Sequence, residues 1–233
     1  MPVELSPALT DLFPPGAVAA VLLEPGDPAT LRPEELACMA RAVPKRMREF
    51  AAGRQCAHRL LAELGAVDAP LLVGRNREPL WPPDIVGSIT HTEGMCAAVA
   101  ARRTHLGALG IDAETADAVK EELFAPICTD EELEWLRACA GPRRALMAAL
   151  IFSAKEAFHK GQFSMTGEWL GFEDVAVELD VLGSAHGEFV IRPQRALALS
   201  EHQPPPWSGR FLFDDRYVVT GVGLSPARAG TAQ

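Results

Sequence analysis

Apolar residues in this chain fall into short runs, which are typical of strands, and longer periodic stretches, which are typical of helices. The short runs, bounded by Pro, Gly or polar clusters, predict strands at residues 17–23, 85–89, 95–101, 109–113, 175–181, 188–191, 210–213 and 217–222. The periodic stretches predict helices at residues 33–64, with a break at Pro44, at 129–140 and at 142–160. Because both halves of the chain contain helices and strands, we expect an α+β fold.

Local motifs refine these boundaries. Thr129 and Glu132 have the spacing of a capping box and predict the start of a helix. Gly141 followed by Pro142 should end that helix. Residues 90–94 are polar and lie between two apolar strands, so they predict a tight connection.

The composition is that of a globular protein with a substantial core, since 48% of the residues are hydrophobic and 23% are charged. No apolar run approaches the roughly 20 residues of a membrane span, and the N-terminus lacks the basic and apolar regions of a signal peptide. The five cysteines form no CxxC pair. We therefore expect reduced thiols in a cytoplasmic protein.

The net charge of −9 argues against nucleic-acid binding, but the charges are unevenly distributed. Residues 41–59 contain six basic side chains and one acid, whereas residues 112–134 contain nine acids and one lysine. A basic and an acidic patch suit a ligand that carries phosphates and needs a metal. Two solvated helix faces of opposite sign explain the same composition equally well.

Two acids follow each other closely at the end of the strand predicted at 109–113. Side chains two residues apart on a strand project to the same face, so the carboxylates of Asp112 and Glu114 can converge on one cation. Mg²⁺ is commonly bound by one or two carboxylates together with substrate phosphates. A strand end that emerges into solvent would give the same pattern.

Three other features suit a phosphate ligand, and each has an ordinary alternative. Glu156 and Lys160 are neighbours on one helix face, which also describes a surface ion pair. Arg46 and Arg54 lie two turns apart near one helix face, where they can fork around a phosphate or form a solvated surface. His91 can donate to an anion, or can be a satisfied turn histidine.

The order of these motifs is more specific than any one of them. A basic helix is followed by R-E-P-x-W-P, G-S-x-T-H, G-I-D-x-E and F-x-A-K-E-A-x-x-K. This order strongly resembles the 4′-phosphopantetheinyl transferases. The similarity is greatest to the branch of surfactin-type and enterobactin-type enzymes and of actinobacterial activators of polyketide and non-ribosomal peptide synthesis. The resemblance covers residues 45–174, about half of the chain.

The resemblance implies an enzyme that moves the 4′-phosphopantetheine arm of coenzyme A onto a serine of an apo acyl or peptidyl carrier protein, releasing 3′,5′-ADP. Asp112, Glu114 and Glu156 would bind Mg²⁺. Glu156 would also be the base for the carrier serine, directly or through water, and Lys160 would stabilise the transferring group. We therefore expect Glu156, Lys160 and Asp112 to be the catalytic residues.

The resemblance also implies which side chains bind the phosphates of coenzyme A. Those expected at the phosphates are Thr90, His91, Lys155 and Lys160, and those expected at the 3′-phosphate are Arg46 and Arg54. Relatives often carry a lysine in the loop before the Trp-Pro pair. Either Arg75 or Arg77 would replace it here, and the sequence does not decide which.

The family fold has two similar α/β halves in one chain, related by a pseudo-two-fold axis, with the active site in the cleft between them. This predicts an N-terminal half at 1–106, with the basic helix and His91, and a C-terminal half at 107–233, with the metal carboxylates. The carrier protein would bind the second half near residues 119–127, through the apolar residues Leu123, Phe124 and Ile127. Two fused halves also predict a monomer, and we expect no nucleic-acid or membrane partner.

Two other functions fit part of the pattern. A non-catalytic module that binds coenzyme A or a nucleotide needs the basic residues but not the full set of acids. A phosphohydrolase would use the same carboxylates, but the arginine pair would then have no clear purpose. The complete acid set together with Lys160 favours the transferase.

Overall fold

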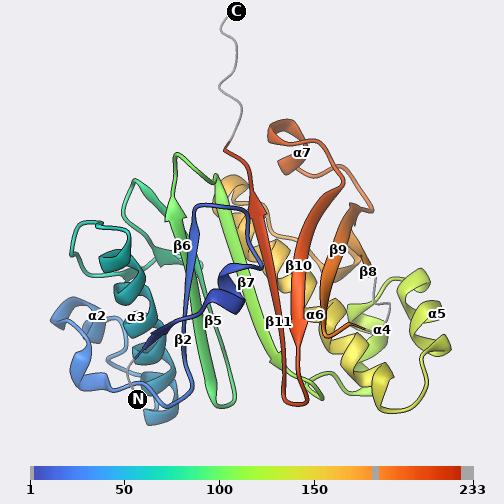
Figure 1. The fold of residues 1–233 in the computed structure, drawn as a ribbon, viewed down its shortest axis with the longest axis horizontal. Coiled ribbons are helices and arrows are strands. Elements are labelled where there is room, and N and C mark those ends of the chain that lie inside the picture. The colour runs from blue at the N-terminus through green and yellow to red at the C-terminus, as the bar shows by residue number, and fades with distance from the viewer. Residues whose placement is uncertain (1–2, 180–183, 227–233) are drawn as a thin grey trace, which may run out of the picture.

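The computed structural model describes residues 3–179 and 184–226. Two antiparallel sheets lie side by side, and a long helix packs against each of them (Figure 1). Helix α3 (Pro44–Glu63) packs on the first sheet and helix α6 (Pro142–Thr166) on the second. The α+β class expected from the sequence is confirmed, whereas the pseudo-two-fold relation of the halves stays a prediction.

Each sheet is built from antiparallel neighbours, and the two sheets meet at β5 and β7. The first sheet contains, in spatial order, β1 (Glu4–Leu5), β2 (Ala17–Leu22), β6 (Met95–Arg102) and β5 (Ile85–Thr92). The second contains β7 (Ala108–Thr115), β11 (Tyr217–Leu224), β10 (Trp207–Phe213), β9 (His186–Pro193) and β8 (Val175–Leu179). In its register Asp112 of β7 lies opposite Thr220 of β11. Strands β3 (Leu72–Val73) and β4 (Pro79–Leu80) form a separate small hairpin.

Short helices fill the connections between the strands. They are α1 (Pro7–Thr10), α2 (Pro33–Ala37), α4 (Phe124–Ile127), α5 (Asp130–Ala138) and α7 (Leu199–His202), with 3₁₀ turns η1 (Pro28–Thr30), η2 (Glu121–Leu123) and η3 (Phe172–Asp174). The break expected at Pro44 is confirmed, since α2 ends before it and α3 begins with it. The capping box is confirmed as well: the Glu132 amide donates to the Thr129 hydroxyl, and the Thr129 amide donates to the Glu132 carboxylate. Among the helices of the described residues, none has the length and apolar character needed to cross a bilayer.

Several boundaries differ from the sequence expectation; for example, β9 and β10 begin at His186 and Trp207, before the predicted residues 188 and 210. The polar connection expected at 90–94 shrinks to Glu93 and Gly94, and Gly94 has a φ of +79°, which favours glycine. Residues 90–92 belong to β5 because they continue the antiparallel pairing with β6, in which Thr90 lies opposite Ala97. Helix α6 continues past residue 160 to Thr166. The strand expected at 175–181 is seen as far as Leu179, and its last two residues lie outside the described residues.

A common apolar cluster holds the two sheets together. Strand side chains alternate between faces, so Ala98 and Ala100 of β6 pack towards α3, whereas Val99 packs on the opposite face. There Val99 belongs to the same buried cluster as Ile111 and Val219 of the second sheet. Helix α1 lies in front of this face (Figure 1). Apolar burial therefore fixes the sheets relative to one another.

Helix α6 approaches β7 very closely. A Cβ atom on Gly110 would lie 1.8 Å from the carbonyl oxygen of Ala157 and 2.8 Å from the amide nitrogen of Gly161. A larger residue at 110 would therefore push the helix away from the strand. The contact places the α6 residues Glu156 and Lys160, which precede Ala157 and Gly161 in the chain, near the end of β7.

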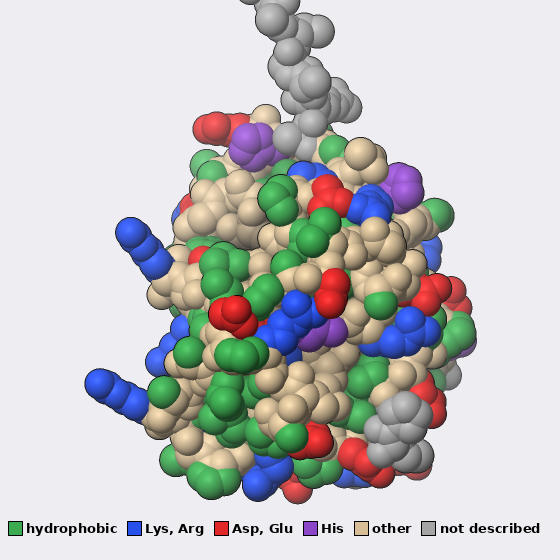
Figure 2. All heavy atoms as spheres, turned by 90° about the vertical axis from the view of Figure 1, so that its left-hand side faces the viewer, with side chains coloured by type: hydrophobic (Ala, Val, Ile, Leu, Met, Phe, Trp, Pro, Cys, Tyr) green, Lys and Arg blue, Asp and Glu red, His purple; other side chains and the backbone are tan. Residues whose placement is uncertain are grey.

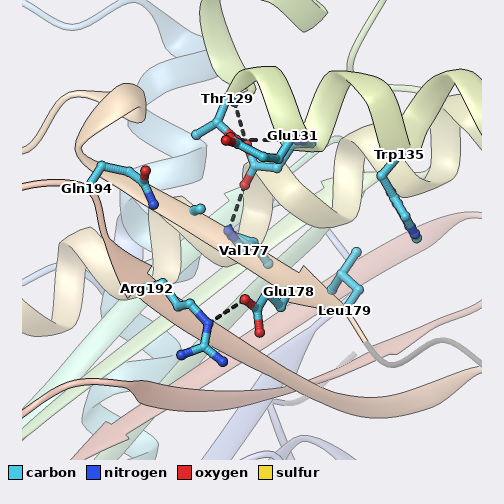
Figure 3. Close-up of a pocket in the computed structure, with 10 residues that line it drawn as sticks. Thr129, Glu131, Trp135, Val177, Glu178, Leu179, Arg192 and Gln194 are labelled. Atoms are coloured by element: carbon cyan, nitrogen blue, oxygen red, sulfur yellow. Dashed lines mark hydrogen bonds and ion pairs between the residues drawn. The ribbon is translucent and has the colours of Figure 1, made fainter.

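A buried ion pair ties α5 and α6 to the edge of the second sheet. The Lys155 ammonium donates to the Glu132 carboxylate at 2.7 Å and to the carbonyl oxygens of Ile127 and Phe172, both at 2.9 Å. The second oxygen of Glu132 accepts the amide of Val177 at 2.6 Å, beside a hollow of about 420 Å³ between α5 and β8 (Figure 3). Lys155 is 2% exposed, so these bonds compensate the desolvation of both charges.

Replacing Lys155 with Met should lower the free energy of unfolding by about 3–5 kcal/mol, because the Glu132 carboxylate would stay buried without its counter-ion. Urea denaturation measures this. Lys120→Met is the matched control, since Lys120 pairs with Asp117 at the surface and its loss should cost at most about 1 kcal/mol. Equal costs for the two substitutions would contradict the structural role of Lys155.

Candidate active site

A cleft of about 820 Å³ lies between α6 and the N-terminal half of the chain. One wall consists of α6 residues, including Glu156 and Lys160, and the other of β5 and residues 76–81. The lining combines charged side chains, such as Glu156, Lys160 and Arg103, with aromatic and apolar ones: Leu80, Trp81, Phe163, Met165 and Trp169. This arrangement suits a ligand that has a charged part and a flexible, largely apolar part.

Asp112 is a buried acid that contacts Lys160, a residue of the cleft wall. The Lys160 ammonium donates to Asp112 Oδ1 at 2.6 Å and to the carbonyl oxygen of Ile111 at 3.3 Å. The Thr90 hydroxyl donates to the same Oδ1 at 3.2 Å. Asp112 is 4% exposed, and its other oxygen, Oδ2, is buried without a hydrogen-bond partner among the described residues. A buried carboxylate oxygen without a partner is costly and is open to a cation.

The neighbouring carboxylates repel one another. Burial and the charges of Asp112 and Glu156 raise the pKa of Glu114 to about 7, against the opposing effect of Lys160. Burial and Asp112 also raise the pKa of Glu156, again opposed by Lys160. The three carboxylates therefore share one negative field, which the single ammonium of Lys160 only partly balances.

The donor set fits a hard divalent cation, since it offers carboxylate oxygens, one of them without a partner. The side chains are not gathered into a coordination shell, however. Within residues 3–179 and 184–226, no three His, Cys, Asp or Glu side chains lie close enough to hold a metal ion together. The ammonium of Lys160 is the cation that contacts Asp112 in this arrangement.

Strand β5 reaches across to β7 through two hydroxyl groups. The amide of Ile111 donates to Ser88 Oγ at 3.2 Å, and the amide of Ala113 donates to Thr90 Oγ1 at 3.1 Å. Thr90 is buried and its hydroxyl donates to Asp112 of β7, while its expected contact with a ligand phosphate stays a prediction. The sequence analysis missed Ser88, although polar residues at alternate positions of an apolar strand are a signal for such a seam.

A second hollow, of about 320 Å³, lies between α3 and the β5–β6 hairpin. Arg46 donates to His91 Nε2 at 3.0 Å, and Glu49 lies 3.2 Å from the same nitrogen. Burial lowers the pKa of His91, and the charges of Arg46 and Lys160 add to this effect, while Glu49 opposes it. The ring nitrogen Nε2 can accept a hydrogen bond from Arg46 or donate one to Glu49, depending on the tautomer.

The basic character of the α3 region is interrupted by acids. Figure 2 shows Lys and Arg side chains on the face that carries α2 and α3, interspersed with Asp, Glu and apolar side chains. One acid, Glu49, contacts three side chains of this region: Lys45, Arg46 and His91. The expected basic patch is thus a set of cations partly balanced by their neighbours.

Two expected phosphate ligands lie in the interior. Arg54 donates its Nε to the carbonyl oxygen of Leu71 at 2.6 Å and Nη2 to that of Leu72 at 3.4 Å, and its guanidinium stacks on Phe50. The forked clamp expected from Arg46 and Arg54 is therefore not formed, because Arg54 supports the segment that leads into the cleft. Burial lowers its pKa to about 10.

Lys155 requires the same correction, because its ammonium already makes three interior hydrogen bonds. Spacing along a helix predicts a shared face but not what covers that face.

Of the other residues expected at the site, some line the cleft or the surface and others do not. Arg77 lines the cleft at the turn between β3 and β4, whereas Arg75 is not among the residues of its walls. Phe124 and Ile127 are buried in the core, so a direct contact of these two with a carrier protein is corrected, and Leu123 is the exposed member of that group. His159 and Trp169, which the sequence analysis did not single out, also line the cleft.

Comparisons with known proteins extend over nearly the whole chain. The model of the 4′-phosphopantetheinyl transferase N-terminal domain matches residues 33–101, and that of the 4′-phosphopantetheinyl transferase superfamily matches residues 108–220. The 4′-phosphopantetheinyl transferase Svp of Streptomyces mobaraensis is 36% identical over 90% of this chain and 85% of its own. Npt of Nocardia iowensis is 31% identical over 92% of this chain and 98% of its own, and PptT of Mycobacterium tuberculosis is 41% identical over 83% and 74%.

Replacing Thr90 with Val should lower the free energy of unfolding by about 1–3 kcal/mol, because the Ala113 amide would lose its acceptor inside the protein. Thr90→Ser is the matched control, since it keeps the hydroxyl and should cost less than half as much. Urea denaturation of both variants measures the difference. A Ser variant as unstable as the Val variant would show that packing of the methyl group, and not the hydrogen bonds, matters at this position.

Proposed function

Because the chain belongs to the 4′-phosphopantetheinyl transferase superfamily, we propose that it transfers the 4′-phosphopantetheine group of coenzyme A to a serine of an apo acyl or peptidyl carrier protein and releases 3′,5′-ADP. The observation that carries this proposal is the cleft in which Lys160 meets Asp112 beside Glu114 and Glu156. That group of charges is suited to a pyrophosphate and its counter-ion.

Coenzyme A would lie between an N-terminal half at 1–106 and a C-terminal half at 107–233. Its pyrophosphate would contact Lys160, with Arg77 on the opposite wall. Arg46 and His91 would contact the 3′-phosphate, since His91 lines the second hollow beside α3 and Arg46 hydrogen-bonds to His91. The pantetheine arm would follow the apolar lining towards Trp169. This orientation matches the charged and apolar parts of the donor to those of the cleft.

Asp112, Glu114 and Glu156 would hold Mg²⁺, which when bound neutralises charge on the pyrophosphate. The carrier serine would attack the phosphorus next to the pantetheine arm, and the bond from that phosphorus to the oxygen of 3′,5′-ADP would break. Lys160 would stabilise charge on the transferring group. Glu156 would accept the serine proton, directly or through water.

The carrier protein would bind the C-terminal half beside η2. Leu123 is 44% exposed there, next to the acids Glu121 and Glu122. We propose a contact dominated by this apolar side chain, because acidic carrier helices would be repelled by the surrounding carboxylates. A monomer in the cytoplasm is consistent with a cleft that both halves of a single chain line.

The transferase should add one phosphopantetheine mass to an apo carrier protein when incubated with coenzyme A and Mg²⁺, as measured by intact mass spectrometry. Lys160→Ala should slow the reaction about 10²-fold or more, because it removes a charge aimed at the transferring group. Arg192→Ala, which removes an exposed cation paired with Glu178, should leave the rate unchanged. Chelation of Mg²⁺ should stop the reaction, and its return should restore it.

Other outcomes of the same assay point to other functions. Binding of coenzyme A without modification of several carriers would indicate a binding module. Release of phosphate or nucleotide without a carrier would indicate a phosphohydrolase. Lys160 also pairs with Asp112, so its loss could destabilise the fold. The loss of rate supports a catalytic role only if Lys160→Ala has the same melting temperature as the wild type.

Leu123→Asp should raise the KM for the carrier protein about fivefold or more, as expected for the loss of an apolar anchor worth about 1 kcal/mol. The KM for coenzyme A should not change. Leu36→Asp is the matched control, because Leu36 is also 44% exposed but lies in α2 of the N-terminal half. Equal KM values for wild type and Leu123→Asp would exclude the proposed contact.

A further inference from the structure

The segment between α6 and β8 forms one rim of the cleft. It carries Trp169, which is 71% exposed although its ring is large and apolar. The ring meets His159 edge-on at 4.8 Å and Phe163 at 6.2 Å between centroids, and all three side chains line the cleft. An aromatic side chain with so much exposed surface needs a well-fixed backbone if it is to offer a defined wall.

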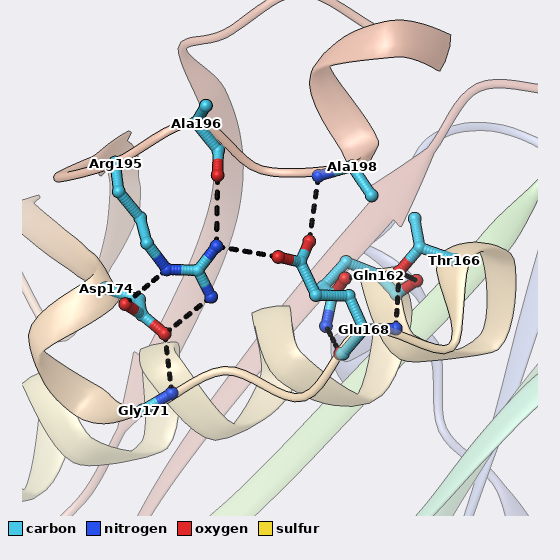
Figure 4. A network of polar contacts seen from close by, with 8 residues as sticks. All are labelled: Gln162, Thr166, Glu168, Gly171, Asp174, Arg195, Ala196 and Ala198. Carbon is cyan, nitrogen blue, oxygen red and sulfur yellow. Dashed lines mark hydrogen bonds and ion pairs between the residues drawn. The ribbon is translucent and has the colours of Figure 1, made fainter.

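Arg195, from the connection after β9, joins the two ends of this segment. Its Nη1 donates to Glu168 at 2.7 Å, while Nε and Nη2 donate to the two oxygens of Asp174 at 2.6 and 2.9 Å (Figure 4). Glu168 and Asp174 flank Trp169 in the chain. One guanidinium therefore holds both ends of the rim in a forked, bidentate arrangement.

Both carboxylates are also fixed by backbone amides. Glu168 accepts the amide of Ala198 at 2.8 Å, and Asp174 accepts that of Gly171 at 2.8 Å (Figure 4). The hydrogen bonds from Arg195 are the largest cause of the lowered pKa of Glu168 and of Asp174. The charges are thus present at neutral pH, and each is held from two sides.

The segment is anchored to α6 as well. The buried Gln162 donates its amide to the carbonyl oxygen of Glu168 at 2.7 Å, and the Glu168 amide donates to the Thr166 hydroxyl at 3.0 Å. These bonds fix the start of the rim, and the bond from Lys155 to the carbonyl oxygen of Phe172 helps to fix its return towards β8. Arg195 is the side chain that bonds to both Glu168 and Asp174.

We propose that Arg195 is a positioning residue for the transfer reaction: by linking Glu168 to Asp174 it holds Trp169 as a wall for the pantetheine arm of coenzyme A. This inference rests on the proposed function. Ion pairs at an exposed site contribute little to global stability, so the effect of Arg195 should fall on the binding of the arm and not on folding.

A double-mutant cycle with Arg195→Ala and Trp169→Ala tests this, with KM and kcat measured for coenzyme A at saturating carrier protein. Arg195→Ala should raise the KM about fivefold, because the ligand must then order the rim, and should change kcat less than about twofold. In the Trp169→Ala background the same substitution should have no further effect. Arg195→Lys, which keeps the charge but not the fork, should restore part of the loss.

Arg192→Ala is the matched control. Arg192 lies three residues before Arg195 in the chain and forms an exposed ion pair with Glu178. It should leave both kinetic constants unchanged. An equal rise in KM in both Trp169 backgrounds, or an equal effect of Arg192→Ala, would overturn the role of Arg195. Calorimetric binding of coenzyme A without carrier separates the two hypotheses. A wild type that does not bind it overturns the proposed function, whereas binding that Arg195→Ala does not weaken overturns the positioning role alone.

Discussion

The site depends on the close contact between helix α6 and strand β7. Gly110 has no room for a Cβ atom against the Ala157 carbonyl, so the helix rests directly on the strand backbone. Side chains one turn apart on the helix then reach the end of the strand, and Lys160 can bond to Asp112 at 2.6 Å. The cost is a concentration of carboxylates in a partly buried place, which appears as the raised pKa values of Glu114 and Glu156. Close packing thus creates the electrostatic field that a phosphate donor and its cation would use.

Two lysines of α6 lie in very different environments because they point to different sides of the helix. Lys155 and Lys160 are five residues apart, about 140° around the helix axis, so they point in different directions. Lys155 enters the interior, where Glu132 and two carbonyl oxygens satisfy it completely. Lys160 enters the cleft, where one ammonium faces an acid cluster that it only partly neutralises. The first arrangement holds α5, α6 and the sheet edge together, and the second leaves charge available for chemistry.

Local rules predicted much of this molecule from its sequence. Alternation along a strand correctly placed Asp112 and Glu114 on β7, and the spacing of Thr129 and Glu132 located the start of α5. The interior roles of Arg54 and Lys155 were not predictable in the same way. Their partners, Leu71 and Glu132, lie 17 and 23 residues away, and helix periodicity does not say which element covers a given face. Thr90 was placed in a turn because residues 90–94 are polar, whereas the pairing with β6 extends through Thr92.

Among the described residues, side chains and not a backbone ladder join the two sheets between β5 and β7, and this affects how the protein can evolve. Ser88 and Thr90 bridge β5 to the amides of β7, and in the described part of the chain no backbone ladder joins these two strands. A ladder has the same spacing whatever its side chains are, whereas a hydroxyl bridge exists only for particular residues. Substitutions at two positions can therefore widen or narrow the gap between the halves while each sheet keeps its register. The geometry of the joint can therefore change separately from the strand pairing within each sheet.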